Sequence, residues 1–290
     1  MSAAEAFIPQ RGRGVALYCL AILLLATMDA AAKWLTSGFP VGEIVFFRSA
    51  FALIPLMLFG MRGAGSLTSR LKTARPWAHL ARGMVVLVTL VSFFAALLHL
   101  PLATVTVITL ANPVFMLLIG VLWLRERVGG VQWLAVALGL AGVVVVCGWS
   151  GLGMDVYSLM AIVSAFSYAL ASILTRRLAA TDSPLSITFY GTLVMLVASL
   201  CTVGGGWLWP QGGEWLVLIL LGLAGAAANF VNALSLRHVE LSAVAPLEYT
   251  ILLWAAGFGY LLFGEIPGPN ALLGGVLIVA SGVLAARQSR

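Results

Sequence analysis

The sequence predicts an all-α integral membrane protein with ten transmembrane helices in two five-helix repeats of inverted topology. Three observations predict this fold: the composition of the chain, the spacing of its apolar segments, and a similarity between its two halves. Of the 290 residues, 62% are hydrophobic and only 9% are charged. Water-soluble domains carry roughly a quarter of their residues as charged side chains. Lipid is therefore the solvent for most of this chain.

Charge clusters, glycines and prolines divide the chain into ten apolar segments. A bilayer core about 30 Å thick needs roughly 20 residues for each helical crossing, so ten crossings use about 200 residues and leave short connectors. The first segment lacks the small-residue cleavage site of a signal peptide, and we expect it to remain as a helix. The predicted helices span residues 14–35, 42–61, 77–98, 102–124, 130–148, 156–178, 186–204, 214–236, 241–263 and 269–286.

Basic residues gather in every second connector, and the connectors between them carry almost none. Lys and Arg beside membrane helices accumulate on the cytoplasmic side. This asymmetry predicts a multi-pass membrane protein with both termini cytoplasmic. The net charge of +6 comes from the same connectors, so it predicts no nucleic-acid partner. The basic connector residues are Arg11, Arg13, Arg62, Arg70, Lys72, Arg75, Arg125, Arg127, Arg176, Arg177, Arg237, Arg287 and Arg290.

The two halves of the chain resemble each other when the sequence is shifted by 139 residues. This offset superposes a glycine and a following glutamate, because Gly120 meets Gly259 and Glu126 meets Glu265. We predict a first repeat at 1–148, a linker at 149–155 and a second repeat at 156–290. Five helices is an odd number, so the second repeat enters the membrane in the opposite sense. Inverted repeats of this kind build a central site that opens alternately to each side.

The residues that carry this similarity also resemble a known family. In the first half they are PLATV at Pro101–Val105, ANP at Ala111–Pro113 and GVLWLRE at Gly120–Glu126. In the second half they are LSAVAP at Leu241–Pro246 and GYLLFGE at Gly259–Glu265. Together they are similar to the EamA-type drug/metabolite transporter superfamily, and among its members to YddG-like bacterial exporters of aromatic amino acids.

The resemblance implies a basket of ten helices around a central cavity. The first, third, fourth, sixth, eighth and ninth helices would line the cavity, and the fifth and tenth would be peripheral. It also implies a secondary transporter of the bacterial inner membrane that exports amino acids, including aromatic ones, or related small metabolites.

Three ionisable residues of the first two predicted helices lie inside apolar segments, where a charge costs about 2.5–3.5 kcal/mol on insertion scales. Asp29 and Lys33 are four residues apart, so they share a helix face and could form an ion pair. Such a pair would either bind a substrate charge or a proton, or be structural. Arg48 either attracts a substrate carboxylate or ties to Asp29 or Glu43.

Three further ionisable residues lie on the third and ninth predicted helices. Glu248 has no basic residue within one turn, and it either binds a substrate ammonium group or a proton, or is a hydrogen-bonded structural carboxyl group. His79 and Arg82 begin the third helix at its cytoplasmic end. They either form a mouth for anionic substrates or are the ordinary basic flank of a membrane helix.

Prolines interrupt the fourth and ninth predicted helices, at Pro113 and Pro246. Each removes a backbone donor and frees a carbonyl group at membrane depth, where a water-lined cavity could satisfy it. A tolerated kink is the alternative. The 139-residue offset does not superpose the two prolines, which argues against symmetric breaks in the two helices.

Polar and aromatic side chains on the third, fourth, sixth, eighth and ninth helices predict a pocket at mid-membrane. Asn229 and Asn232 are three residues apart and share one helix face. Any of these side chains could instead bridge or pack helices. The predicted pocket residues are Ser92, Phe93, Asn112, Tyr168, Asn229, Asn232, Glu248, Tyr249 and Trp254, with Thr109 and Ser164 as further candidates.

Small residues recur at close spacing in the fifth and tenth predicted helices. This spacing lets helices approach closely, either within one chain or between two copies. We predict a monomer or a weak homodimer. The residues are Ala135, Gly139 and Gly142 in the fifth helix and Gly274, Gly275 and Gly282 in the tenth.

No sequence pattern predicts a catalytic or metal site. HExxH, GxSxG and paired intramembrane aspartates are absent, and the three cysteines lack CxxC spacing. We predict no cofactor and no metal, and the predicted partners are a small-molecule substrate and the lipid bilayer. Amino acid export is the leading function. Efflux of toxic organic cations is the alternative within transport, and an intramembrane enzyme is a distant one.

Overall fold

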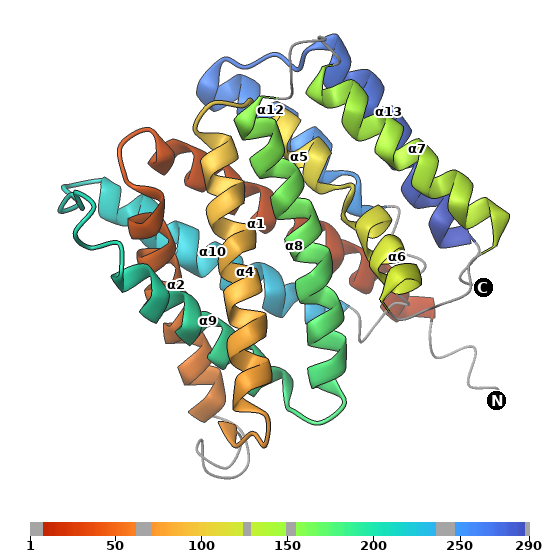
Figure 1. Ribbon diagram of the computed structural model, residues 1–290. Coiled ribbons are helices and arrows are strands. Elements are labelled where there is room, and N and C mark those ends of the chain that lie inside the picture. The colour runs from red at the N-terminus through yellow and green to blue at the C-terminus, as the bar shows by residue number, and fades with distance from the viewer. Residues whose placement is uncertain (1–7, 62–70, 124–128, 149–154, 236–246, 288–290) are drawn as a thin grey trace.

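The protein is helical throughout the part of the chain that the computed structural model describes, which is residues 8–61, 71–123, 129–148, 155–235 and 247–287 (Figure 1). The helices in chain order are α1 (Ile8–Thr36), α2 (Val41–Met61), α4 (Pro76–Leu97), α5 (Leu102–Thr109), α6 (Asn112–Leu122), α7 (Gly130–Cys147), α8 (Val156–Ala179), α9 (Pro184–Leu200), α10 (Glu214–Ser235), α12 (Ile251–Phe263) and α13 (Pro269–Arg287).

Ten apolar segments of the described chain are available to cross a membrane. Seven are long and apolar enough by themselves, and α5 with α6 makes one of these, Leu102–Leu122. The remaining three are shorter apolar helices, Pro184–Leu200, Ile251–Phe263 and Pro269–Leu284. The predicted all-α membrane fold of ten helices in two inverted five-helix repeats is confirmed. Most helix ends agree with the predicted ones to within a few residues.

Local sequence sets the beginnings of several helices. Pro76 stands in the first turn of α4, where its missing N–H removes no helical hydrogen bond. The Asp155 carboxylate accepts a hydrogen bond from the Tyr157 backbone N–H at the start of α8. The Ser183 hydroxyl does the same for the Ser186 N–H at the start of α9. These caps satisfy backbone donors that have no partner within their own helix.

The two repeats interlock, because their most extensive packing crosses from one repeat to the other. Helix α1, the first of its repeat, packs along α10, the third helix of the other repeat. The reciprocal pair is α8 with α4, and the two second helices, α2 and α9, pack on each other. The pseudo-two-fold relation between the repeats therefore runs through the whole interface. Figure 1 shows α4 and α8 side by side at the front.

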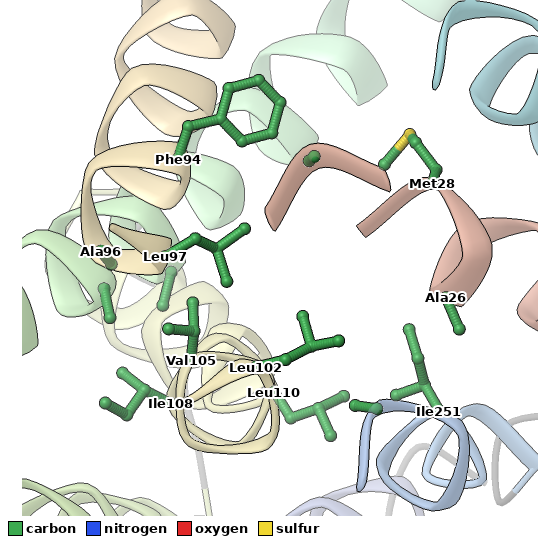
Figure 2. Close-up of a cluster of buried hydrophobic side chains, with 14 of the residues drawn as sticks. Ala26, Met28, Phe94, Ala96, Leu97, Leu102, Val105, Ile108, Leu110 and Ile251 are labelled. Carbon is green, nitrogen blue, oxygen red and sulfur yellow. The ribbon is translucent and has the colours of Figure 1, made fainter. Parts of the chain in front are cut away.

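The buried apolar core lies where α1, α4, α5 and α12 meet. Side chains from α4 and α5 form one side of this cluster, and side chains from α1 and the start of α12 form the other (Figure 2). The Phe94 and Leu102 side chains are fully buried. The labelled members of the cluster are Ala26, Met28, Phe94, Ala96, Leu97, Leu102, Val105, Ile108, Leu110 and Ile251.

Helices α7 and α13 form a pair at the edge of the molecule (Figure 1). Glycines let their backbones touch. A Cβ atom on Gly274 would lie 2.6 Å from the Gly142 carbonyl oxygen, and one on Gly142 would lie 2.9 Å from the Gly274 carbonyl oxygen. Of the small residues predicted to permit close approach, Gly142 and Gly274 therefore pack against each other within the chain.

Candidate functional site

A cavity of about 320 Å³ lies between the two repeats. Its wall is formed by seven helices: α1, α2, α4, α5, α6, α8 and α10. Glu248, just before α12, and Ile251, the first residue of α12, complete it. This volume falls in the range of small-molecule sites. The helices expected to line a central cavity do so, and α2 joins them through Arg48.

Two helix interruptions border the cavity. Helix α5 ends at Thr109 and α6 begins at Asn112, with a turn at residues 110–111. In the second repeat, residues 247–248 are helical, residues 249–250 form a turn and α12 begins at Ile251. The 139-residue offset superposes these two turns. The breaks are therefore symmetric, and the prediction against symmetry is wrong.

That prediction was based on the two prolines, which do not occupy equivalent positions relative to the two helix breaks. Pro113 lies in the first turn of α6, just after its break, where a missing N–H is tolerated. Pro246 lies outside the described residues. The two breaks bring Thr109, Leu110, Glu248 and Ile251 to the cavity wall, so the non-helical backbone lies where it lines a cavity.

Arg48 is a cation in the cavity wall with few partners. Its Nη2 atom lies 3.8 Å from the Met28 sulfur, and its buried Nε atom has no hydrogen-bond partner. Asp29 lies in the same wall and within electrostatic range, but the two residues form no ion pair in the described part of the chain. The proposed tie to Glu43 is not formed either, because the Glu43 carboxylate accepts the Leu208 N–H at 3.0 Å.

Glu248 and two amides line the part of the cavity formed by the second repeat. The Glu248 side chain is exposed and lies within electrostatic range of the Tyr18 and Tyr168 hydroxyl groups. Asn229 donates a hydrogen bond of 2.8 Å to the Gly225 carbonyl oxygen. The Oδ1 atom of Asn232 is buried and has no hydrogen-bond partner among the residues that the structure describes.

Most of the predicted pocket residues come together, and three do not. Phe93, Asn112, Tyr168, Asn229, Asn232 and Glu248 line the cavity, as do Thr109 and Ser164. Ser92 is buried in α4 away from the cavity wall. Trp254 packs near Phe258 with ring centroids 6.3 Å apart. Tyr249 directs its hydroxyl group against Gly282 of α13. These three side chains do not line the described cavity, because a residue's depth in the membrane does not give its direction around the helix. A part for them in substrate binding stays a prediction.

The α1 side of the cavity includes residues that sequence reasoning missed. Tyr18, Ile22, Leu25 and Asp29 all line the cavity. These positions follow one another at intervals of three or four residues, so they share one helix face. Asp29, the charged member of that face, could have identified the others through this spacing.

Lys33 does not pair with Asp29, which corrects the predicted charge pair. Its Nζ atom lies 2.5 Å from Oε1 of Glu265 and 2.7 Å from the Leu100 carbonyl oxygen. The Lys33 ammonium also lies 5.5 Å from the centroid of the Phe263 ring. The repeat counterpart of Glu265, Glu126, lies outside the described residues.

His79 and Arg82 hold helices together, so the structure does not present them as a mouth. His79 is buried, and its Nε2 atom lies 3.3 Å from Oδ1 of Asp182. Arg82 donates to Thr175 Oγ1 at 2.6 Å and to the Ile187 carbonyl oxygen at 3.1 Å. These contacts tie α4 to α8 and α9.

Asp182 lies in the connector between α8 and α9, outside the membrane-spanning helices. Hydrogen bonds from Thr73 and Thr181 lower the pKa of Asp182 below its ordinary value, and His79 adds a smaller contribution in the same direction.

Three relatives span nearly the whole chain. The S-adenosylmethionine uptake transporter of Rickettsia felis is 29% identical, covering 92% of this chain and 90% of that protein. The pseudopaline exporter CntI of Pseudomonas aeruginosa is 30% identical, covering 96% and 97%. A riboflavin transporter of Rhizobium johnstonii is 26% identical, covering 93% and 89%.

A solved crystal structure matches the fold with a TM-score of 0.66 at 21% identity, covering 96% of this chain and 99% of the other. The model of the EamA-like transporter family matches twice, at residues 12–148 and 156–287. The two matches fall on the two interlocked repeats that enclose the cavity. The chain therefore belongs to the EamA-like transporter family.

Proposed function

We propose that this protein exports amino acids across a bacterial inner membrane by alternating access through the central cavity. Membership of the family makes the chain a multi-pass membrane transporter of small metabolites, and it sets aside the intramembrane enzyme. The identity of the cargo and the direction of its movement are the proposal.

The Arg48 guanidinium carries the proposal, because it lies half-buried in the cavity wall and its buried Nε atom has no hydrogen-bond acceptor among the described residues. Guanidinium groups present five N–H donors in a fixed fork. A buried donor without a partner is costly. A carboxylate accepts two such donors in parallel, which makes it the ligand that best fits this group.

Two carboxylates supply the complementary half of the site. Asp29 and Glu248 line the same cavity as Arg48 and have no basic partner within ion-pair distance in the described chain. A substrate ammonium group would neutralise one of them. A zwitterion therefore satisfies both kinds of charge at once, which an organic cation does not do, because it leaves Arg48 without a partner.

The remaining wall suits a side chain with apolar surface. Phe93, Leu90, Leu25 and Ile251 contribute carbon atoms, and Tyr168 and Asn112 add polar groups. The relatives support the general class of cargo. S-adenosylmethionine, named for one of them, is itself an α-amino acid. That relative takes up its cargo and CntI exports its own, so the direction of transport needs a direct measurement.

Counterflow into proteoliposomes tests the cargo. Vesicles loaded with one unlabelled compound are given a trace of the same compound with a label, and labelled aromatic and aliphatic amino acids, S-adenosylmethionine, riboflavin and a quaternary ammonium cation are compared. We expect amino acids to exchange. Exchange of the quaternary cation alone would replace the proposal with efflux of organic cations.

The same vesicles test coupling and direction. Repeating the exchange with an imposed pH gradient separates proton coupling, for which Asp29 is the candidate, from uncoupled facilitation. Net flux from vesicles with the termini outside gives the direction, because the basic connectors predict cytoplasmic termini. Net movement only toward the side of the termini would show uptake and would overturn the proposed export.

A further inference from the structure

We propose that the Lys33–Glu265 ion pair is a gate that holds the cavity shut at the face opposite the termini. This proposal rests on transport by alternating access. For the cavity to open at that face, the Lys33–Glu265 ion pair must first separate.

The ion pair is the centre of a four-way cluster. Lys33 Nζ binds Glu265 Oε1 at 2.5 Å and the Leu100 carbonyl oxygen at 2.7 Å. The second carboxylate oxygen of Glu265 accepts the Leu102 backbone N–H at 2.9 Å. The exposed fractions of the Lys33 and Glu265 side chains are only 10% and 22%. One pair thus joins the end of α1, the α4–α5 connection and the segment after α12.

The cluster crosses between the two repeats. Lys33, Leu100 and Leu102 belong to the first repeat, and Glu265 belongs to the second. Relative movement of the repeats at this face has to separate the carboxylate from the ammonium group and from the Leu102 N–H. A contact that is made and broken by movement between repeats is what alternating access requires of a gate.

The cluster also lies at the end of the cavity. Asp29 is the last α1 residue in the cavity wall, and Lys33 follows it by one turn, about 6 Å along the axis. Leu102 precedes Thr106, the first cavity residue of α5 after the connection, by the same number of residues. The Leu97 and Leu102 side chains, at the end of α4 and the start of α5, are fully buried.

A cation also packs on an aromatic ring where α6 and α8 end. Arg177, in the last turn of α8, places its guanidinium carbon 4.8 Å from the Trp123 ring at the end of α6. That contact lies at the surface, since Trp123 is 51% exposed. The Lys33 and Glu265 side chains are more enclosed, which sets their ion pair apart from an ordinary surface contact.

The physical chemistry of the pair suits a two-state device. Inside the closed face, each charge is stabilised by the other and by a backbone group. When the face opens, water replaces these partners, so neither charge is left bare in either state. Removing one partner disfavours only the closed state, because it leaves the other charge buried without compensation.

Distance measurements between spin labels test the gate without any substrate. Labels are placed on Ser37→Cys and Ile266→Cys, two exposed positions on either side of the cluster, with Cys19, Cys147 and Cys201 replaced by serine. In lipid nanodiscs the unaltered pair should give one short distance. Glu265→Gln and Lys33→Gln should raise the population of a longer distance roughly tenfold, a size set by hydrogen bonds to charged groups.

Two controls separate a gate from a structural pair. Glu214→Gln neutralises a carboxylate at the same face that accepts a hydrogen bond from the Gln211 N–H of its own connector, and it should leave the distances unchanged. The charge swap Lys33→Glu with Glu265→Lys should restore the short distance. Unchanged distances in both neutral variants would overturn the proposal. It would equally be overturned if both neutral variants lost their fold while the swap kept it, because the pair would then serve stability alone.

This assay and the counterflow screen fail independently. The gate is read from distances in the substrate-free protein, so a wrong cargo leaves the result intact. A disproved gate leaves the cavity and its charges as they are.

Discussion

Two cations on the first two helices, Lys33 at the end of α1 and Arg48 in α2, have opposite surroundings. Lys33 has a carboxylate, a backbone carbonyl and an aromatic ring around its ammonium group. Arg48 has one weak sulfur contact and a buried Nε without a partner. Both residues looked alike in the sequence, as single charges in apolar helices. Their surroundings divide them into a charge used by the fold and a charge left for a ligand.

The difference teaches how to sort buried charges in such a chain. A charge whose partners are all protein groups acts on the stability of one conformation. A charge without protein partners at a cavity wall acts on whatever enters the cavity. The predictions below test this division between the two kinds of charge, from the largest expected effect to the smallest.

Replacing Arg48 should have the largest effect. Arg48→Gln removes the carboxylate receptor, so amino acid exchange should fall by about 10- to 100-fold in kcat/KM, the range that hydrogen bonds to a charged group represent. In Arg48→Lys, kcat/KM should fall less, since lysine keeps the charge but lacks the bidentate fork of arginine. Initial rates of counterflow measure both. The exposed Arg176→Gln is the matched control, and unchanged rates in Arg48→Gln would break the division.

Replacing Glu248 should have a smaller effect on the same assay. Glu248→Gln keeps the shape of the side chain but removes a charge for the substrate ammonium, so we expect exchange to fall about tenfold with expression preserved. The variant should also be compared with the unaltered protein on an analogue that lacks the amino group. Only the zwitterionic amino acid should bind the variant more weakly. Wild-type exchange in the purified variant would remove Glu248 from the site.

The α7–α13 pair offers a change that touches neither cation. Gly274→Ala would place a methyl group 2.6 Å from the Gly142 carbonyl oxygen, which belongs to backbone and cannot rotate away. We expect a loss of about 1–3 kcal/mol in stability from this overpacking. The neighbouring Gly275→Ala is the control, since its Cβ would lie 3.6 Å from Val107, an ordinary contact.

Thermal melting of the purified protein in detergent, followed as the fraction that stays monodisperse, compares these two alanine variants. Equal melting temperatures would mean that α7 and α13 separate readily. The KM of exchange should be unchanged in both variants, because neither glycine lines the cavity.

The smallest effect is expected at Asp182, a charge whose partners are protein groups. Hydrogen bonds from Thr73 and Thr181 lower its pKa, so this carboxylate stabilises the fold fully above its unfolded pKa of about 3.9. That contribution is lost as the pH falls through the lowered folded pKa. Asp182→Asn should therefore melt at a lower temperature at about pH 7, with the gap narrowing below about pH 4. A change in KM instead would contradict the division.

The helices and their inverted duplication could be predicted because they depend on composition and local pattern. Apolar length fixes each crossing, and five helices per repeat fix the inversion. The positions of the helix breaks depended on more than local sequence. Pro113 suggested a break in the fourth helix, but the matching turn at residues 249–250 contains no proline and follows from the packing of its helix beside the cavity.

The site could be predicted as a set of residue types but not as a set of partners. Asp29, Arg48, Asn229, Asn232 and Glu248 were identified because polar groups in apolar helices are conspicuous, and all line the cavity. The partner of Lys33 was missed. Glu265 lies in the other repeat, and four-residue spacing pointed to Asp29 instead, since sequence proximity shows only neighbours on the same helix.

The interlocked packing of the repeats has a consequence for how the chain is made. Helix α4 packs along α8, and α1 packs along α10, so each early helix finds its main neighbour only after the second repeat has been synthesised. Until then, the faces of α1 and α4 that later meet the second repeat lack their partner helices. These helix pairs can therefore form only after the second repeat has been synthesised. Helices that are neighbours in the sequence are not the ones that pack most extensively.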